Sequence, residues 1–124
     1  MATVIKKITD ADELCNPNVV KVVVDHDGNA LYFSRSFIPY NRNDDKKPIK
    51  DIVYYKHLGI YAYRKNFLMN FKKLPQSRLE KTEKLEQLRV VESGYKIKTV
   101  VTNFQTIDVA TPEDLKKVEK LLRK

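Results

Sequence analysis

The sequence predicts an α/β domain built on a mixed β-sheet with flanking helices, to which a β-hairpin and a long polar loop are added. Three observations support this class. Segments with strand patterns recur along the chain, segments with helix-start signals lie between them, and residues 35–51 show neither pattern. With 124 residues the chain has the length of one domain, so we predict a single domain over residues 1–124.

The hairpin is predicted by two short apolar runs on either side of a turn signal. Residues 19–24 (VVKVVV) are β-branched and suit a strand buried on both faces. Asp27-Gly28 favours a tight turn, and residues 30–34 (ALYFS) return as a second strand. The following stretch, 35–51, is polar and interrupted by two prolines, which predicts a long loop of the kind that serves binding or assembly.

Residues 54–64, YYKHLGIYAYR, have the two-residue period of a strand. One parity carries Tyr55, His57, Gly59, Tyr61 and Tyr63, and the other carries Leu58, Ile60 and Ala62. We predict that the aliphatic parity faces the core and that the tyrosine parity is a surface with chemistry. The alternative is a half-buried strand whose tyrosines pack with their hydroxyls in water.

Two helices are predicted after this strand. Asn66 can cap a short helix that presents Phe67 and Phe71. Ser77 and Glu80, in SRLE, form a capping box that opens a longer helix, in which apolar residues recur every third position through residue 91.

The chain ends with one more strand and one more helix. Residues 95–102 (YKIKTVVT) alternate as a strand, and Thr111 then caps a helix with Pro112 in its first turn. The apolar face of that helix consists of Leu115, Val118, Leu121 and Leu122.

Composition excludes several classes of protein. No apolar run approaches the roughly 20 residues of a membrane span, the first residues lack the pattern of a secretory signal, and we expect a cytoplasmic location. The lone Cys15 excludes an internal disulfide framework and argues against structural zinc. The formal charge of +8 favours an anionic partner: nucleic acid, a membrane surface or a small anionic substrate. The lysines are interleaved with acids, as on a solvated mixed-charge surface.

Glycine-rich phosphate loops are absent, since the glycines stand only at positions 28, 59 and 94. A nucleophile elbow and a zinc-ligand pair at helical spacing are absent as well. What remains is a constellation of polar residues: Arg35, His57, Tyr61, Glu86, Gln87 and Asp108.

This constellation, with its neighbours, resembles the carboxy-terminal half of the 3-deoxy-manno-octulosonate (Kdo) cytidylyltransferases, also called CMP-Kdo synthetases. Four segments carry the resemblance in family order: NPNVVKVVVDHDGNALYFSRSFIPY, KHLGIYAYRKNFL, SRLEKTEKLEQLRV and TPEDLKKVEKLL. Together they extend over residues 16–122, and four segments in register are a specific signal.

The resemblance implies a partial nucleotide-diphospho-sugar transferase fold and a nucleotidyltransferase that joins CTP to Kdo, with magnesium, for lipopolysaccharide synthesis. It implies that Arg35 pairs with the sugar carboxylate and that the other substrate-binding residues, His57, Tyr61, Glu86 and Gln87, bond to hydroxyls. We also expect a homo-oligomer and no nucleic-acid or membrane partner. The alternatives are that Arg35 anchors the following loop, that His57 is structural, and that the two helical residues make ordinary surface pairs.

Two departures from the family pattern set the expected activity. The glycine-rich segment that holds the CTP phosphates and an acidic metal-binding segment are missing, so the chain resembles a fragment. At the last loop, where the family has an aspartate before Thr-Pro, this sequence has Ala110, which leaves Asp108 as the nearby candidate metal ligand. We therefore expect the chain alone to be inactive and to bind no magnesium.

Three hypotheses follow from the sequence. The first is a fragment of a CMP-Kdo synthetase that holds the sugar-acid half-site. The second is a non-catalytic interaction or regulatory module derived from that fold, which Ala110 favours. The third is a basic nucleic-acid-binding domain, which the charge and seven tyrosines favour but which lacks a clustered stripe of arginine and aromatic residues.

Overall fold

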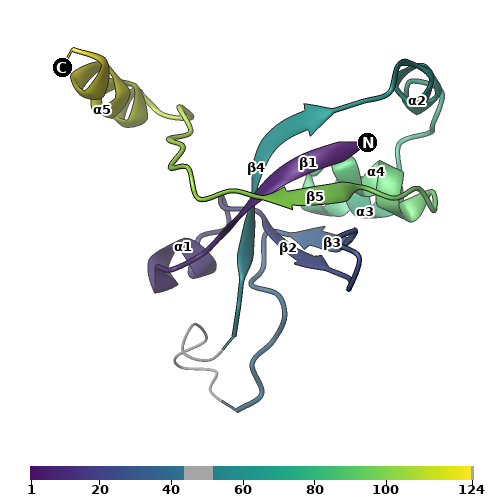
Figure 1. Ribbon diagram of the computed structural model, residues 1–124, viewed down its shortest axis with the longest axis horizontal. Helices are drawn as coiled ribbons and strands as arrows, with labels where there is room; N and C mark the ends of the chain where they lie inside the picture. The colour runs from purple at the N-terminus through teal and green to yellow at the C-terminus, as the bar shows by residue number, and fades with distance from the viewer. Residues whose placement is uncertain (44–51, 124) are drawn as a thin grey trace.

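A five-stranded mixed sheet is the centre of the computed structural model, which describes residues 1–43 and 52–123 (Figure 1). Its strands are β1 (Ala2–Lys7), β2 (Lys21–Val24), β3 (Ala30–Ser34), β4 (Tyr55–Ala62) and β5 (Lys98–Val101). They lie in the order β3-β2-β4-β1-β5. β1 and β5 are parallel, whereas the other neighbours are antiparallel, which confirms the predicted mixed sheet.

Five helices complete the described fold: α1 (Ala11–Cys15), α2 (Lys65–Phe71), α3 (Arg78–Glu83), α4 (Gln87–Glu92) and α5 (Pro112–Leu122). Figure 1 shows α3 and α4 together beside the sheet, α2 beyond the end of β4, and α5 on an arm that leaves β5. Within the described residues, no helix has the length and apolar content of a membrane span.

The predicted hairpin is confirmed as β2 and β3. The Asp25 carboxylate accepts hydrogen bonds from the backbone N–H groups of Asp27 and Asn29, and Gly28 has a φ of +79°, which favours glycine in this turn. β2 is not buried on both faces as predicted, because only its first half is covered: Lys21 and Val22 are buried and the next two valines are half-buried. Residues 35–43 of the long loop form no helix or strand, and residues 44–51 lie outside the described residues.

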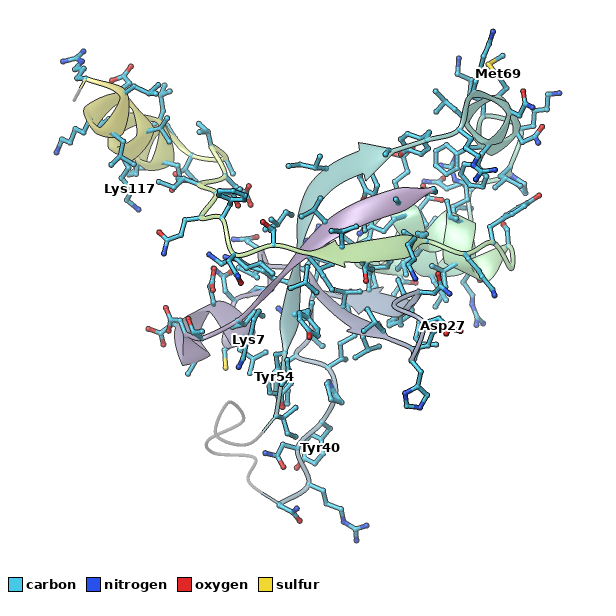
Figure 2. All side chains as sticks on the ribbon, in the orientation of Figure 1. Lys7, Asp27, Tyr40, Tyr54, Met69 and Lys117 are labelled. Carbon is cyan, nitrogen blue, oxygen red and sulfur yellow. The ribbon has the colours of Figure 1, made fainter. Side chains whose placement is uncertain are left out.

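One hydrophobic core joins the sheet to α3 and α4. Its fully buried members come from strands and helices alike: Ile5, Phe33, Leu88, Val90 and Ile97. A smaller cluster of Ile8, Leu14 and Tyr54 lies under α1. Figure 2 shows Tyr54 at the start of β4, near the base of the long loop.

The predicted long helix after Ser77 is two short helices. The capping box of Ser77 and Glu80 is confirmed, but Lys84 takes a left-handed conformation with a φ of 57° and ends α3. The break lets Leu85 turn into the core before α4 begins at Gln87. The prediction that Asn66 caps α2 was wrong, because the helix begins one residue earlier, at Lys65, and has no side-chain cap.

The predicted cap of α5 is confirmed. Thr111 and Asp114 form a capping box, and Pro112 stands in the first turn. No residue of α5 is buried by the part of the chain that the structure describes, and Leu122 is 81% exposed. The apolar face that the sequence predicts is therefore real but uncovered.

Glu83 is the link between the hairpin and the two helices. Its carboxylate accepts a hydrogen bond from the Ser34 hydroxyl at 2.7 Å and another from the backbone N–H of Arg35 at 3.0 Å. The Arg35 side chain donates in turn from Nε to the Glu83 carbonyl at 2.7 Å. These bonds hold the end of β3 against the end of α3.

We predict that Glu83→Ala lowers the free energy of unfolding by about 1.5–3 kcal/mol, since it removes hydrogen bonds to a charged acceptor. Urea unfolding followed by circular dichroism measures this change. Glu119→Ala is the matched control, because Glu119 is an exposed carboxylate on α5. Equal losses in the two variants would contradict the assigned role of Glu83.

Candidate functional site

The predicted burial of the aliphatic face of β4 is wrong for two of its three residues, since Leu58 alone is half-buried. Ile60 is 56% exposed and Ala62 is exposed, whereas His57 and Tyr61 are half-buried. The His57 ring packs edge-on against Phe33 with 5.1 Å between centroids, and the Tyr61 ring lies 5.1 Å from the His57 ring. The predicted core parity is wrong because the aromatic parity faces the hairpin, α3 and α4, which supply the core of this chain.

A bulge in β4 sets the spacing of the two aromatic residues. Thr3 pairs with Tyr61 and Ile5 pairs with His57, so the two-residue step on β1 spans four residues on β4. Gly59 lies inside the bulge with a φ of +70°, and a Cβ there would meet nothing within 4 Å. Glycine is therefore favoured at this position by its backbone conformation rather than by a close neighbour.

His57 is held as a neutral ring by burial and by one hydroxyl. Burial lowers the pKa of His57 to about 4. The Thr3 hydroxyl donates its proton to the carbonyl of Ile60 at 2.7 Å, so it accepts from His57 Nε2 at 2.7 Å. This assignment places the imidazole proton on Nε2 and leaves Nδ1 as a hydrogen-bond acceptor.

Three of the predicted substrate-binding residues line one cavity of about 50 Å³, which we call the tyrosine cavity. Its walls are Met1, Tyr61, Tyr63, Phe71, Glu86 and Gln87. The cavity therefore combines aromatic surfaces with two phenols, a carboxylate and an amide. Burial, with smaller contributions from Tyr63 and Glu86, raises the pKa of the Tyr61 hydroxyl far above its ordinary range, so it remains a donor.

His57 contacts one wall residue of this cavity, whereas Arg35 is not among its wall residues. The His57 ring packs on Tyr61, from the side of Phe33. The guanidinium of Arg35 donates to the backbone carbonyls of Glu83, Pro17 and Lys84 at 2.7, 3.0 and 3.3 Å. These bonds use three of its five N–H groups and fix the α3–α4 junction, which then carries Glu86 and Gln87 into the cavity wall.

Asp108 and Ala110 lie apart from the tyrosine cavity, on the exposed segment between β5 and α5. Within the described residues, no group of three or more histidine, cysteine, aspartate or glutamate side chains could hold a metal ion. Magnesium prefers several oxygen ligands in octahedral geometry. In nucleotide-dependent enzymes magnesium is commonly bound through one or two carboxylates together with water and substrate phosphates, so the assignment of Asp108 as a ligand stays a prediction.

Sequence reasoning missed the contributions of β1. Met1 lines the tyrosine cavity, and Thr3 fixes the tautomer of His57, although neither residue belongs to a motif. Tyr63 and Phe71 complete the wall. The alternation along β4 had placed Tyr63 on the same face as His57 and Tyr61, whereas Phe71 was expected only as part of a helix face. Only the pairing of β1 with β4 brings Met1 and Thr3 to this site.

The mixed sheet with flanking helices defines an α/β protein, and the comparison with sequence families gives its class. The family model described as cytidylyltransferase matches residues 1–97. The chain therefore belongs to the cytidylyltransferase family.

The most similar curated relatives include two 3-deoxy-manno-octulosonate cytidylyltransferases. The one from Solibacter usitatus is 46% identical over 123 residues, which is 99% of this chain and 47% of the relative, and the one from Syntrophus aciditrophicus is 51% identical over 98% of this chain. An 8-amino-3,8-dideoxy-manno-octulosonate cytidylyltransferase from Shewanella frigidimarina is 52% identical over 96% of this chain. The chain spans about half the length of the curated relatives it matches.

A solved structure agrees in fold. It is that of a CMP:2-keto-3-deoxy-manno-octonic acid synthetase complexed with CTP, with a TM-score of 0.87 and 45% identity. The match covers 98% of this chain and 48% of the solved chain. The predicted resemblance and the predicted partial nucleotide-diphospho-sugar transferase fold are thus confirmed.

We predict that His57 makes the fold sensitive to acid. The pKa of His57 is 6.5 in the unfolded chain and about 4 in the folded chain. At pH values between these two, the unfolded chain binds a proton that the folded chain does not bind. The free energy of unfolding therefore falls as the pH falls through this window, by up to about 3 kcal/mol from this group. Urea unfolding at about pH 7 and about pH 4.5 measures the change.

His57→Gln is expected to reduce this pH dependence, whereas His26→Gln, in the exposed turn of the hairpin, is expected to retain it. The same pH dependence in wild type and His57→Gln would show that burial of His57 does not control it.

Proposed function

We propose that this chain is the carboxy-terminal, sugar-acid-binding portion of a cytidylyltransferase that transfers CMP from CTP to 3-deoxy-manno-octulosonate, for lipopolysaccharide synthesis. The names of the relatives and the extent of the match support this proposal, since relatives named 3-deoxy-manno-octulosonate cytidylyltransferase match 98–100% of this chain. We further propose that residues 1–124 form one structural unit that works in the cytoplasm as a homo-oligomer.

The convergence of Tyr61, Glu86 and Gln87 on one cavity is the observation that carries the proposal. A sugar acid offers many hydroxyls, and these three side chains supply a phenol, a carboxylate and an amide that can donate or accept. At about 50 Å³ the cavity is smaller than the roughly 300–1,000 Å³ of a small-ligand pocket, so we propose that it forms one wall of the sugar site and does not enclose the sugar. The proposed role of Gln87 suits its burial, since only 5% of it is exposed.

Arg35 and His57 are assigned supporting roles. Arg35 keeps two N–H groups beyond those that bind the three carbonyls, and we assign these to the sugar carboxylate. His57 Nδ1 can accept a hydrogen bond, and the ring also holds Tyr61 in place. In this proposal Arg35 both binds the sugar carboxylate and anchors the local backbone, which were alternative roles in the sequence analysis.

Transfer of CMP needs more than this site. A sugar hydroxyl attacks the α-phosphorus of CTP, its proton is lost, and pyrophosphate leaves. Such a reaction depends on positioned phosphates and neutralised charge. Residues 1–124 contain no glycine-rich phosphate loop, so we propose that the part of the active site that holds the CTP phosphates lies outside them.

We predict that the 124-residue chain releases no pyrophosphate from CTP and Kdo, even with magnesium. Adding the missing amino-terminal portion of a relative, in trans or as one polypeptide, is expected to restore release. A coupled pyrophosphate assay measures both reactions. Release by the chain alone would refute the proposal, and a folded complex that stays inactive would favour the non-catalytic module.

The same assay tests the last loop. If Asp108 is no ligand, Asp108→Asn leaves the restored activity unchanged and Ala110→Asp raises it. If Asp108 replaces the aspartate that the family carries at position 110, Asp108→Asn abolishes activity. Parallel assays with 8-amino-3,8-dideoxy-manno-octulosonate identify the sugar, which sequence identity does not decide because relatives of both kinds reach 52%.

We predict that Tyr61→Phe weakens Kdo binding by about 2–10-fold, because it removes one hydroxyl and leaves the aromatic packing intact. Calorimetry on the complemented protein measures the change. Tyr95→Phe is the matched control, since Tyr95 is 45% exposed and packs edge-on against Phe67, outside the cavity lining. Equal affinities for wild type and Tyr61→Phe would remove Tyr61 from the proposed site.

A further inference from the structure

A second cavity, of about 210 Å³, lies at the other end of β1 and has a different chemistry. We call it the lysine cavity. It is lined by Lys6, Lys7, Thr9, Glu13, Lys56, Gln105 and Thr106. Figure 2 shows Lys7 beside α1, at the end of β1 away from the amino terminus. None of these residues belongs to the tyrosine cavity, and no motif in the sequence pointed to them.

The lining is rich in hydrogen-bond donors and positive charge. The lining residues carry three ammonium groups, two hydroxyls and one amide and, among the described residues, one carboxylate, that of Glu13. Glu13 is already engaged, because it forms an ion pair with Lys56. The cavity therefore keeps a net positive charge and unused donors.

The sheet itself brings two of these charges together. Lys6 and Lys56 are directly opposite each other in the antiparallel pairing of β1 with β4. Like charges at opposed positions of a sheet destabilise it, and Glu13 compensates only one of the two. A bound anion would compensate the other.

The cavity also has the location that α/β sheets use for ligands. β1 and β5 are parallel neighbours, and both end at this side of the sheet. The segments that follow them supply Thr9, Gln105 and Thr106. Ligands of such sheets bind at the carboxyl ends of parallel strands. Met1 lines the tyrosine cavity and Lys7 lines the lysine cavity. These positions are six residues apart, which at about 3.3 Å each separates the two cavities by about 20 Å along β1.

We propose that the lysine cavity binds a phosphate-type dianion. Its volume of about 210 Å³ is many times the roughly 10–15 Å³ that one water molecule needs, so a phosphate or a diphosphate group fits. Lysine binds phosphate as a point charge, whereas a carboxylate is better matched by the planar fork of arginine, and the lining contains no arginine. The site is separate from the sugar-acid half-site and does not depend on it.

Inorganic phosphate is the probe for the test, titrated into the ¹⁵N-labelled chain at constant ionic strength. We expect saturable shifts of the amides of Lys6, Lys7, Thr9 and Thr106. Lys6→Gln combined with Lys7→Gln is expected to weaken binding by at least about tenfold. Lys72→Gln combined with Lys73→Gln is the control, because it removes the same charge from an exposed lysine pair at the end of α2. Pyrophosphate and acetate titrations distinguish a diphosphate and a carboxylate from phosphate.

A third variant has the opposite expected sign, so that unfolding cannot imitate it. Glu13→Gln frees Lys56 and is expected to tighten phosphate binding several-fold. Equal weakening by the two lysine pairs, shifts spread over the whole surface, or acetate binding as tightly as phosphate would overturn the proposal. Weaker binding by Glu13→Gln would overturn it as well.

Discussion

The antiparallel pairing of β1 with β4 is the contact on which both cavities depend. At one end it sets Thr3 against Tyr61 and brings Met1 to the wall of the tyrosine cavity. At the other end it sets Lys6 against Lys56 and forms the floor of the lysine cavity. The bulge at Gly59 lies between them and spaces His57 and Tyr61 so that the His57 ring packs edge-on against Phe33 and the Tyr61 ring packs against His57. A shift of this register by one residue would move the side chains of one strand to the opposite face of the sheet, and both cavities would lose their present walls.

The two cavities differ in electrostatic character because they differ in burial and partners. Two groups at the tyrosine cavity are held neutral: burial lowers the pKa of His57 and raises the pKa of the Tyr61 hydroxyl. Neutral donors and acceptors beside the Glu86 carboxylate suit the hydroxyls of a sugar. Around Lys6 the groups are charged and only partly compensated by Glu13, which suits a dianion. One short strand thus separates two kinds of recognition.

Many apolar side chains of this chain are exposed, which agrees with its covering only about half of its relatives. Ile60, Val100 and Val101 are each more than half exposed, and α5 packs against nothing that the structure describes. The chain spans about half the length of its relatives. Exposed apolar strands and a free apolar helix face are what division of a larger sheet would leave. The exposed apolar surface is therefore what we expect of one portion of a larger sheet.

Local signals in the sequence determined the hairpin, the capping boxes at Ser77 and Thr111, the mixed sheet and the polar residues of the tyrosine cavity. These depend on neighbours within a few positions, or on segments that match a family in order. Tertiary structure alone decided which face of β4 is buried, because that depends on what lies on each side and not on the alternation itself. It also decided that Arg35 binds three carbonyls, that Lys84 breaks the helix, and that Lys6 meets Lys56. Each of these depends on residues far apart in the chain, whose proximity only strand pairing and packing create.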